Sequence, residues 1–322
     1  MNDDYKNYLS RVDLIKNQVE RERLREQQVQ QTRKQRMQKQ LLEKQQQILQ
    51  AELTSRMFAS VYSTGGDESS TDTDAQAFIT AASITDTTQQ SAINTLVTNL
   101  KSYGIWTKMN FIYPFVGGTA STHKWNLKNP LDTDAAFRLL FSGGVTHSTN
   151  GVQFGGVNGW AETYLNPNTV FNTNDSFHLS IYSRTNSASN SAYEMGGQNG
   201  STRTALLLRS ALGNVFNYAH LNGIVTANPN STGMYVSTRE TSTSLKLFRN
   251  NVQLGSTYTG ANGARFDLTL PIGAYKVGVN PPSNFSNRQY AFASIGDGLT
   301  DTEAANLYTA VQAFQTTLGR NI

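Results

Sequence analysis

The first glycine of the chain is Gly65 and the first proline is Pro114, so the residues before Gly65 contain neither of the two residues that interrupt helices. This segment is instead rich in Gln, Glu, Lys, Arg and Leu, which favour helix. Residues 1–57 hold 12 of the 27 Lys and Arg and 8 of the 23 Asp and Glu, and therefore the whole formal net charge of +4. The sequence predicts a long helix over residues 1–60 that differs in chemistry from the rest of the chain.

A helix of this length needs a partner against which to bury a face. Apolar residues recur at the a and d positions of heptads, and the frame shifts by one residue after Val29, which locally unwinds a supercoil without breaking the helices. The pattern predicts a coiled-coil stalk that self-associates, although these seam residues do not fix the number of strands. The seam comprises Tyr5, Tyr8, Val12, Ile15, Val19, Val29, Met37, Leu41 and Ile48.

The basic run at residues 21–47, RERLREQQVQQTRKQRMQKQLLEKQQQ, has three interpretations: a nucleic-acid arm, a disordered tail or a mechanical part. Acidic residues are interspersed among its bases and it contains no aromatic residue, so a phosphate-binding stripe with stacking side chains is not favoured. Disorder stays open because residues 30–36 include no apolar side chain. Apolar seam residues on both sides of the run favour the third interpretation. In it, the run is the least stable, middle part of a helical stalk, which bends there or binds another protein.

Residues 63–76, STGGDESSTDTDAQ, have the composition of a flexible connector, and we place a linker at 61–83 before a domain at 84–322. The chain has no cysteine, which excludes disulfides, thiol catalysis and thiolate zinc sites. It also lacks the apolar core of a signal peptide and any apolar run near the ~20 residues of a membrane span. We therefore expect neither a cleavable export signal nor membrane insertion.

The domain shows the period of two that is typical of strands. Phe177, Leu179 and Ile181 share one face of a run whose other face carries polar residues. Five Asn-Gly dipeptides, at Asn150, Asn158, Asn199, Asn222 and Asn262, predict hairpin turns, and strands do not alternate with long helices. The predicted fold is mainly β, an antiparallel sandwich.

Two amphipathic helices flank the predicted strands. The first runs from about Asp86, which can cap it together with Gln89, to Tyr103. The second starts at the Thr300 and Glu303 capping box and stops before Gly319. We expect the apolar stripe of each helix to pack on the sandwich.

Two motifs resemble a known superfamily. The hairpin at residues 244–256, SLKLFRNNVQLGS, is similar to the strand, x-Asn-Gly-x, strand hairpin of laminin-G-like and concanavalin-like jelly rolls, with Asn250-Asn251 in place of Asn-Gly. The ending with Leu299, Thr300, Glu303, Leu307 and Tyr308 resembles the superfamily pattern L-[ST]-x-x-E-x-x-x-L-Y. More specifically, residues 84–130, which begin ITDTTQQSAINTL, and residues 292–319, FASIGDGLTDTEAANLYTAVQAFQTTLG, resemble segments of tailed-bacteriophage structural proteins, and this resemblance covers about residues 84–318.

The resemblance implies a non-enzymatic virion component, a head or tail fibre or another appendage. In that setting the N-terminal helices form a homotrimer and bind other virion proteins. The jelly roll then decorates the particle surface or contacts host-surface glycans, after assembly in the host cytoplasm. The alternatives are a carbohydrate-binding receptor module and an enzyme that degrades polysaccharide.

Residues for catalysis or metal binding are sparse. A retaining glycosidase needs two carboxylates about 5 Å apart, and Glu162, Glu194 and Glu240 lack the E-x-D-x-x-E spacing that supplies them in concanavalin-like enzymes. The four histidines are scattered without zinc-ligand spacing. Asp132 and Asp134 form a D-x-D pair that could hold calcium, although a polar turn explains them equally well. We expect no other cofactor.

One loop carries a candidate sugar site. Residues 156–168, GVNGWAETYLNPN, bring an aromatic pair, Trp160 and Tyr164, close in sequence to two amides, Asn158 and Asn166. Aromatic rings can stack on the apolar face of a sugar while amides bind its hydroxyls. The competing interpretation is that the two aromatic residues belong to the core of the sandwich.

Overall fold

The computed structural model describes residues 28, 31, 39, 70–189 and 192–322. The chain divides into two units, residues 1–68 and residues 69–322, and the second unit is described here. The predicted coiled-coil seam from Tyr5 to Ile48 lies outside the described residues, so the stalk and its trimer stay predictions. Among the helices of the described part, none is both long and apolar enough to cross a lipid bilayer.

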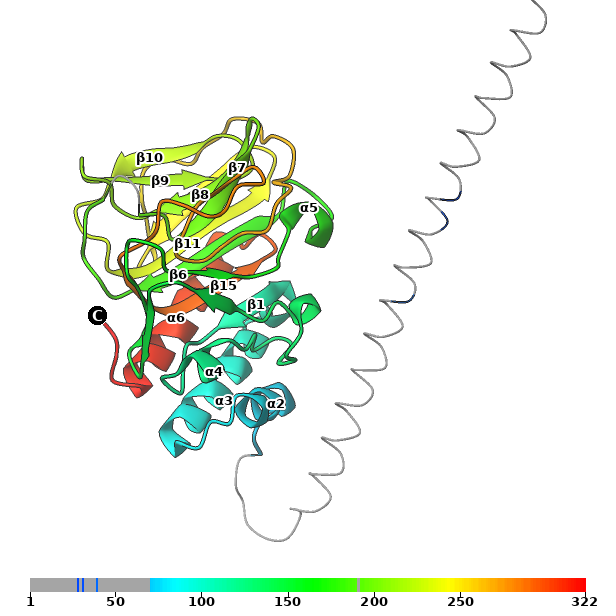
Figure 1. Cartoon of the computed structure of the whole chain (residues 1–322), viewed down its shortest axis with the longest axis vertical. Helices are drawn as coiled ribbons and strands as arrows, with labels where there is room; N and C mark the ends of the chain where they lie inside the picture. The colour runs from blue at the N-terminus through cyan, green and yellow to red at the C-terminus, as the bar shows by residue number, and fades with distance from the viewer. Residues whose placement is uncertain (1–27, 29–30, 32–38, 40–69, 190–191) are drawn as a thin grey trace, which may run out of the picture. The chain divides into compact units, whose positions relative to one another are not determined.

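Two antiparallel sheets form a sandwich, which confirms the predicted mainly β jelly-roll fold (Figure 1). The larger sheet has the order β13-β12-β11-β6-β15-β4-β3, and β1 pairs with β15. Its strands are β1 (Met109–Tyr113), β3 (Val145–Ser148), β4 (Gly151–Phe154), β6 (Phe177–Ser183), β11 (Gly233–Thr241), β12 (Ser244–Arg249), β13 (Val252–Gln253) and β15 (Gln289–Gly296).

The smaller sheet has five strands in the order β10-β9-β8-β7-β14, and β14 joins it in parallel to β7. Ile272 forms isolated bridges to Met195 of β7 and to Ala161 of β5, and so links β7 with a two-stranded ribbon of β2 and β5. The strands are β2 (Leu140–Ser142), β5 (Trp160–Glu162), β7 (Met195–Asn199), β8 (Thr202–Leu207), β9 (Asn214–Tyr218), β10 (Gly223–Ala227) and β14 (Lys276–Val277). Side chains from both sheets fill the core between them, among them Leu179, Leu206 and Tyr235.

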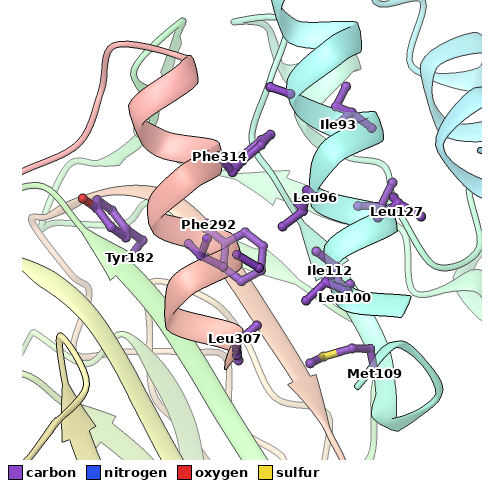
Figure 2. Packing of buried hydrophobic residues seen from close by; sticks show 14 of the residues in the cluster. Ile93, Leu96, Leu100, Met109, Ile112, Leu127, Tyr182, Phe292, Leu307 and Phe314 are labelled. Atoms are coloured by element: carbon purple, nitrogen blue, oxygen red, sulfur yellow. The ribbon is translucent and has the colours of Figure 1, made fainter. Parts of the chain in front are cut away.

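Helices cover the outer face of the larger sheet. Figure 2 shows Leu96 and Phe314 between two neighbouring helices, near Phe292 of the sheet, and Ile93, Leu100 and Leu307 belong to the same cluster. Strand β6 is therefore buried on both faces, with all seven of its residues out of solvent. The helices are α2 (Thr73–Ala81), α3 (Thr87–Ser102), α4 (Ala120–His123), α5 (Pro167–Val170) and α6 (Asp301–Thr317), with short 3-10 turns at Trp106–Lys108 and Asp134–Ala136.

Both predicted flanking helices are confirmed. Asp86 caps α3 by accepting a hydrogen bond from Gln89 N at 2.8 Å, whereas the Gln89 side chain accepts from Gly117 N. Thr300 and Glu303 form the predicted capping box of α6. The end of the predicted linker at residue 83 is wrong, because residues 73–81 form α2 with Phe78 in the core. The sequence did not predict this helix, because its residues are mostly polar and it buries only a few apolar side chains.

The turn at Asn250-Asn251 joins β12 to β13, with Arg249 paired to Val252. Asn250 and Asn251 have positive φ angles of 48° and 63°, as a two-residue type I′ turn requires. The Asn250 amide oxygen also accepts a hydrogen bond from Met234 N at 2.8 Å. Both asparagines therefore provide the backbone conformation of the turn, and Asn250 in addition provides a side-chain hydrogen bond.

Replacing Asn251 by glycine should stabilise the protein by up to about 1 kcal/mol, because glycine adopts positive φ without steric cost. Asn250→Gly is the matched control and should destabilise, since Met234 N then loses its acceptor. Chemical denaturation of both variants measures the effect. Equal changes in the two variants would contradict this division of roles.

Candidate functional site

The outer face of the five-stranded sheet is the broad surface that α3 and α6 leave uncovered, since both pack on the larger sheet. Strand register defines which side chains it carries. Gln198 lies directly opposite Arg203, and Ala205 lies opposite both Gly196 and Tyr218. Leu206 and Val215 point the other way, into the core. Polar and aromatic side chains of β7, β8 and β9 therefore share this outer face.

Four polar side chains meet at one edge of this face. The rings of Tyr193 and Tyr275 stack with their centroids 4.4 Å apart and an angle of 30° between their planes. The Tyr275 hydroxyl donates to Gln198 Oε1 at 3.3 Å, and Arg203 Nη2 donates to the same oxygen at 3.1 Å. Gln198 thus holds a tyrosine and an arginine together.

The arginine also binds the next aromatic side chain. The guanidinium carbon of Arg203 lies 4.7 Å from the centre of the Tyr218 ring, which is a cation–π contact. Tyr218 in turn lies roughly parallel to Phe216, at 6.5 Å between centroids. We call this group the tyrosine platform. It comprises Tyr193, Gln198, Arg203, Phe216, Tyr218 and Tyr275.

Small residues lie between the aromatic rings of the platform. Gly196 and Ala205 face each other on β7 and β8, next to Tyr218. A Cβ atom at Gly196 would come within 2.5 Å of the Ala205 Cα and 2.4 Å of Thr204 O, and its φ of 144° suits glycine. The glycine therefore allows the two strands to approach closely.

The electrostatics of the platform favour hydrogen bonding over proton transfer. Burial raises the pKa of Tyr275 to about 12 and also raises the pKa of Tyr193, so both hydroxyls stay protonated at physiological pH. The Arg203 guanidinium lies close enough to oppose both shifts. The platform offers neutral hydroxyls, one amide and one cation, which is a set for recognition and not for acid–base catalysis.

The four residues of the predicted sugar loop do not contact one another through hydrogen bonds or ring contacts in the described structure. Asn158 Oδ1 accepts from Gly144 N at 2.9 Å, and Asn166 caps α5 while donating to Asp267 at 3.0 Å. Trp160 lies on β5, and Tyr164 follows it with a φ of 58°. Within the described part of the chain, no hydrogen bond or ring contact joins any two of these four side chains. The two amides have structural roles, and the prediction of a glycan site here gains no geometric support.

The predicted calcium ligands bind cationic side chains instead. Asp132 pairs with Lys124 at 2.6 Å and with Arg138 at 3.4 Å, and Asp134 pairs with Arg138 at 2.9 Å. The charges of Lys124 and Arg138 lower the pKa of Asp132. In the described ranges, no three His, Cys, Asp or Glu side chains gather closely enough to hold a metal ion. Because both carboxylates are already neutralised, this turn does not fit a calcium site.

The three glutamates weighed for catalysis lie in separate places. Glu194 is fully buried and bonds Arg288 and Leu208 N. Glu162 accepts from Thr269 Oγ1 at 3.0 Å and from two backbone N–H groups. Glu240 follows Arg239 at the end of β11, and burial raises its pKa. No contact between described residues joins two of these carboxylates.

The sequence could have revealed part of the tyrosine platform. Phe216 and Tyr218 alternate in the run NVFNYA, which places two aromatic side chains on one face of a strand. Arg203 follows the Asn199-Gly200 turn signal by a few residues, so a hairpin could have been expected to bring it near that strand. Tyr275 is 72 residues from Arg203, and no local pattern predicts their proximity.

No protein-family model matches the sequence, and no curated protein is significantly similar to it. Among solved structures, the chain is similar to domain 4 of the extracellular arabinanase AbnA from Geobacillus stearothermophilus, solved with arabinotriose. The identity is 11%, 62% of this chain and 98% of that chain are covered, and the TM-score is 0.43.

Two further structures are similar at the same level. One is a structure of botulinum neurotoxin type C, at 13% identity over 66% of this chain and 53% of that one, with a TM-score of 0.48. The other is a mutant Trypanosoma rangeli sialidase, at 12% identity over 70% of this chain and 39% of that one, with a TM-score of 0.46. None of these three is a virion protein, and the role in a phage particle stays a prediction.

Proposed function

We propose that the unit at residues 69–322 is a glycan-binding module and that the tyrosine platform is its binding site. The observation that carries the proposal is the convergence of Tyr193, Tyr275 and Tyr218 on the Arg203 and Gln198 pair. Pyranose rings present apolar C–H faces that stack on aromatic rings, while their hydroxyls bind amide, phenol and guanidinium groups. The platform supplies both kinds of contact, because the rings of Tyr193, Phe216 and Tyr218 are partly exposed, whereas Tyr275 is only 5% exposed and supports Tyr193 by stacking.

Charge supports a sugar over a nucleic acid as the ligand. Residues 69–322 contain 15 Lys and Arg and 13 Asp and Glu, so the small net charge of +2 gives the unit little attraction for a phosphate backbone. Within the platform the single cation is Arg203, which no carboxylate of the described residues pairs with in a salt bridge. We expect neutral sugars to bind and sugars that carry one carboxylate to bind more tightly.

Replacing Tyr218 by alanine should weaken glycan binding about tenfold or more, because it removes a stacking ring and the support of Arg203. The full-length chain is first screened on an array of neutral and acidic glycans, and the strongest hit is then titrated by calorimetry. Arg203→Gln should reduce binding of the acidic sugar more than of its neutral analogue.

Trp160→Ala is the matched control, because Trp160 is an aromatic residue of the sequence-predicted loop and lies on β5, and among the described residues no hydrogen bond or ring contact joins it to the platform. It should bind like the wild type, provided both variants keep the wild-type melting temperature. Loss of binding in Trp160→Ala alone would move the site to the loop at 156–168. Absence of any binding at millimolar sugar would reject glycan recognition, and release of reducing sugar would reject a purely binding role.

A further inference from the structure

The guanidinium group of Arg239 is a cation buried inside the sandwich. It lies on β11 opposite Phe177, and its side chain is 0% exposed. Nη1 donates to Ser242 O at 2.9 Å, but Nε and Nη2 have no hydrogen-bond partner among the described residues. Leaving charged donors buried and unpaired is strongly unfavourable. The fold therefore places strong donors where they need an acceptor.

His220 adds a second donor of the same kind. It follows β9, is also 0% exposed, and its Nδ1 accepts a hydrogen bond from Phe266 N at 3.4 Å. Because Nδ1 is an acceptor, the proton of the neutral ring lies on Nε2. Nε2 is buried and has no partner within the described part of the protein.

The two side chains share one environment. Phe177, which is the register partner of Arg239, has its ring 5.2 Å from the ring of His220. Burial is the main cause that lowers the pKa of His220 to about 4, and the nearby charge of Arg239 acts in the same direction. On the interior face of β9, opposite Leu206, the amide nitrogen and the amide oxygen of Asn217 are also buried without a partner among the described residues.

The charges around Arg239 and His220 do not balance. Arg265 also lowers the pKa of His220, and Asp175 is the acid whose charge is felt by both His220 and Arg239. The Asp175 carboxylate is held by Asn262 Nδ2 at 2.5 Å. Two arginines and one aspartate leave one positive charge. A water molecule would have to donate hydrogen bonds as well as accept them, whereas an anion only accepts.

We propose that a small inorganic anion of halide size, chloride under physiological conditions, binds between Arg239 and His220 inside the sandwich. The Nε–H and Nη2–H groups of Arg239 and the Nε2–H group of His220 donate to it. Since both side chains are fully buried, the ligand is a structural anion and not an exchangeable substrate. This site is separate from the tyrosine platform, and neither proposal depends on the other.

The melting temperature of the full-length chain should rise when chloride or bromide replaces gluconate at a constant ionic strength of about 0.15 M. We expect a rise of about 3 °C that saturates with halide concentration. Arg239→Met should abolish the dependence on halide. The control is Arg249→Met, because Arg249 is half-buried and donates to Thr232 O just before β11, and it should keep the wild-type dependence.

Bromide diffraction tests the proposal without a variant, in case Arg239→Met does not fold. Crystals of the wild-type protein grown with bromide should show an anomalous peak within hydrogen-bond distance of Arg239 and His220. A wild-type melting temperature that is the same in gluconate and halide overturns the proposal. So does a bromide map with no peak beside Arg239, which would mean that water alone satisfies these donors.

Discussion

Lowering the pH from 7 to about 4.5 should reduce the free energy of unfolding by roughly 5–8 kcal/mol, comparable with the whole stability of a typical domain. The cause is a set of buried histidines. Burial lowers the pKa of His178 to about 4, of His220 to about 4 and of His123 to about 3. Each group contributes about 2.5 kcal/mol at that pH.

The direction follows from proton binding in the two states. In the unfolded chain a histidine has a pKa near 6.5, so below that pH the unfolded state binds protons that the folded state excludes. Stability is therefore full above about pH 7 and falls as the pH drops through 6.5 toward the folded-state values. Burial raises the pKa of Asp297 and Glu194, and these two carboxyl groups offset part of the loss.

His178 is the histidine with which to test this expectation. Its Nδ1 donates to Asp297 O at 2.6 Å and its Nε2 accepts from Ser294 Oγ at 3.2 Å, so the neutral ring is fully bonded. His178→Asn keeps a donor but cannot titrate. Urea denaturation across the pH range should give a slope of stability against pH that is smaller by nearly one proton near pH 5. His147→Asn is the control, because His147 is only partly buried and should change the slope less. Equal slopes for wild type and His178→Asn would refute the assignment.

Local signals predicted the elements that depend on nearby residues. The caps of α3 and α6 and the Asn250-Asn251 turn are each set by a few neighbouring side chains, and all three were found where the sequence placed them. The Asn-Gly dipeptides predicted hairpin turns less reliably. Those at Asn150, Asn199 and Asn222 lie at hairpins, whereas Asn158 lies in the loop before β5 and Asn262 lies in a loop outside the named strands. A turn dipeptide fixes backbone conformation but does not supply a strand on each side.

Local sequence patterns could not predict most of the candidate site. In the loop at 156–168, amides and aromatic residues are close in sequence, but Asn158 and Asn166 use their amides to bind Gly144 and to cap α5. The tyrosine platform instead joins residues from β7 and the segment before it, from β8, from β9 and from the segment before β14, which only the order of the sheet brings together. Buried polar pairs such as Glu194 and Arg288 were equally hidden, because 94 residues separate them.

That buried pair is the basis of the second large effect. Arg288→Met should destabilise the protein by about 3–5 kcal/mol, the usual cost of removing one partner of a buried ion pair. Both side chains are 0% exposed, and the Arg288 guanidinium also donates to the carbonyl oxygens of Ala192 at 3.1 Å and Ser187 at 2.7 Å. The substitution leaves the Glu194 carboxylate without its cation. Burial already raises the pKa of Glu194 and Arg288 opposes this shift, so the variant should raise the pKa of Glu194 further.

Arg138→Met is the matched control, since Arg138 pairs with Asp132 and Asp134 at the surface and should cost less than about 1 kcal/mol. Urea denaturation at pH 7 measures both variants, together with Glu194→Gln and the double variant. Because either single substitution strands a buried partner, the double variant should cost less than the sum of the two single ones. Additive costs would mean that Arg288 acts through its carbonyl contacts and not through Glu194. A loss in Arg288→Met as small as in Arg138→Met would show that water reaches the pair, and that this end of the sandwich is open in solution.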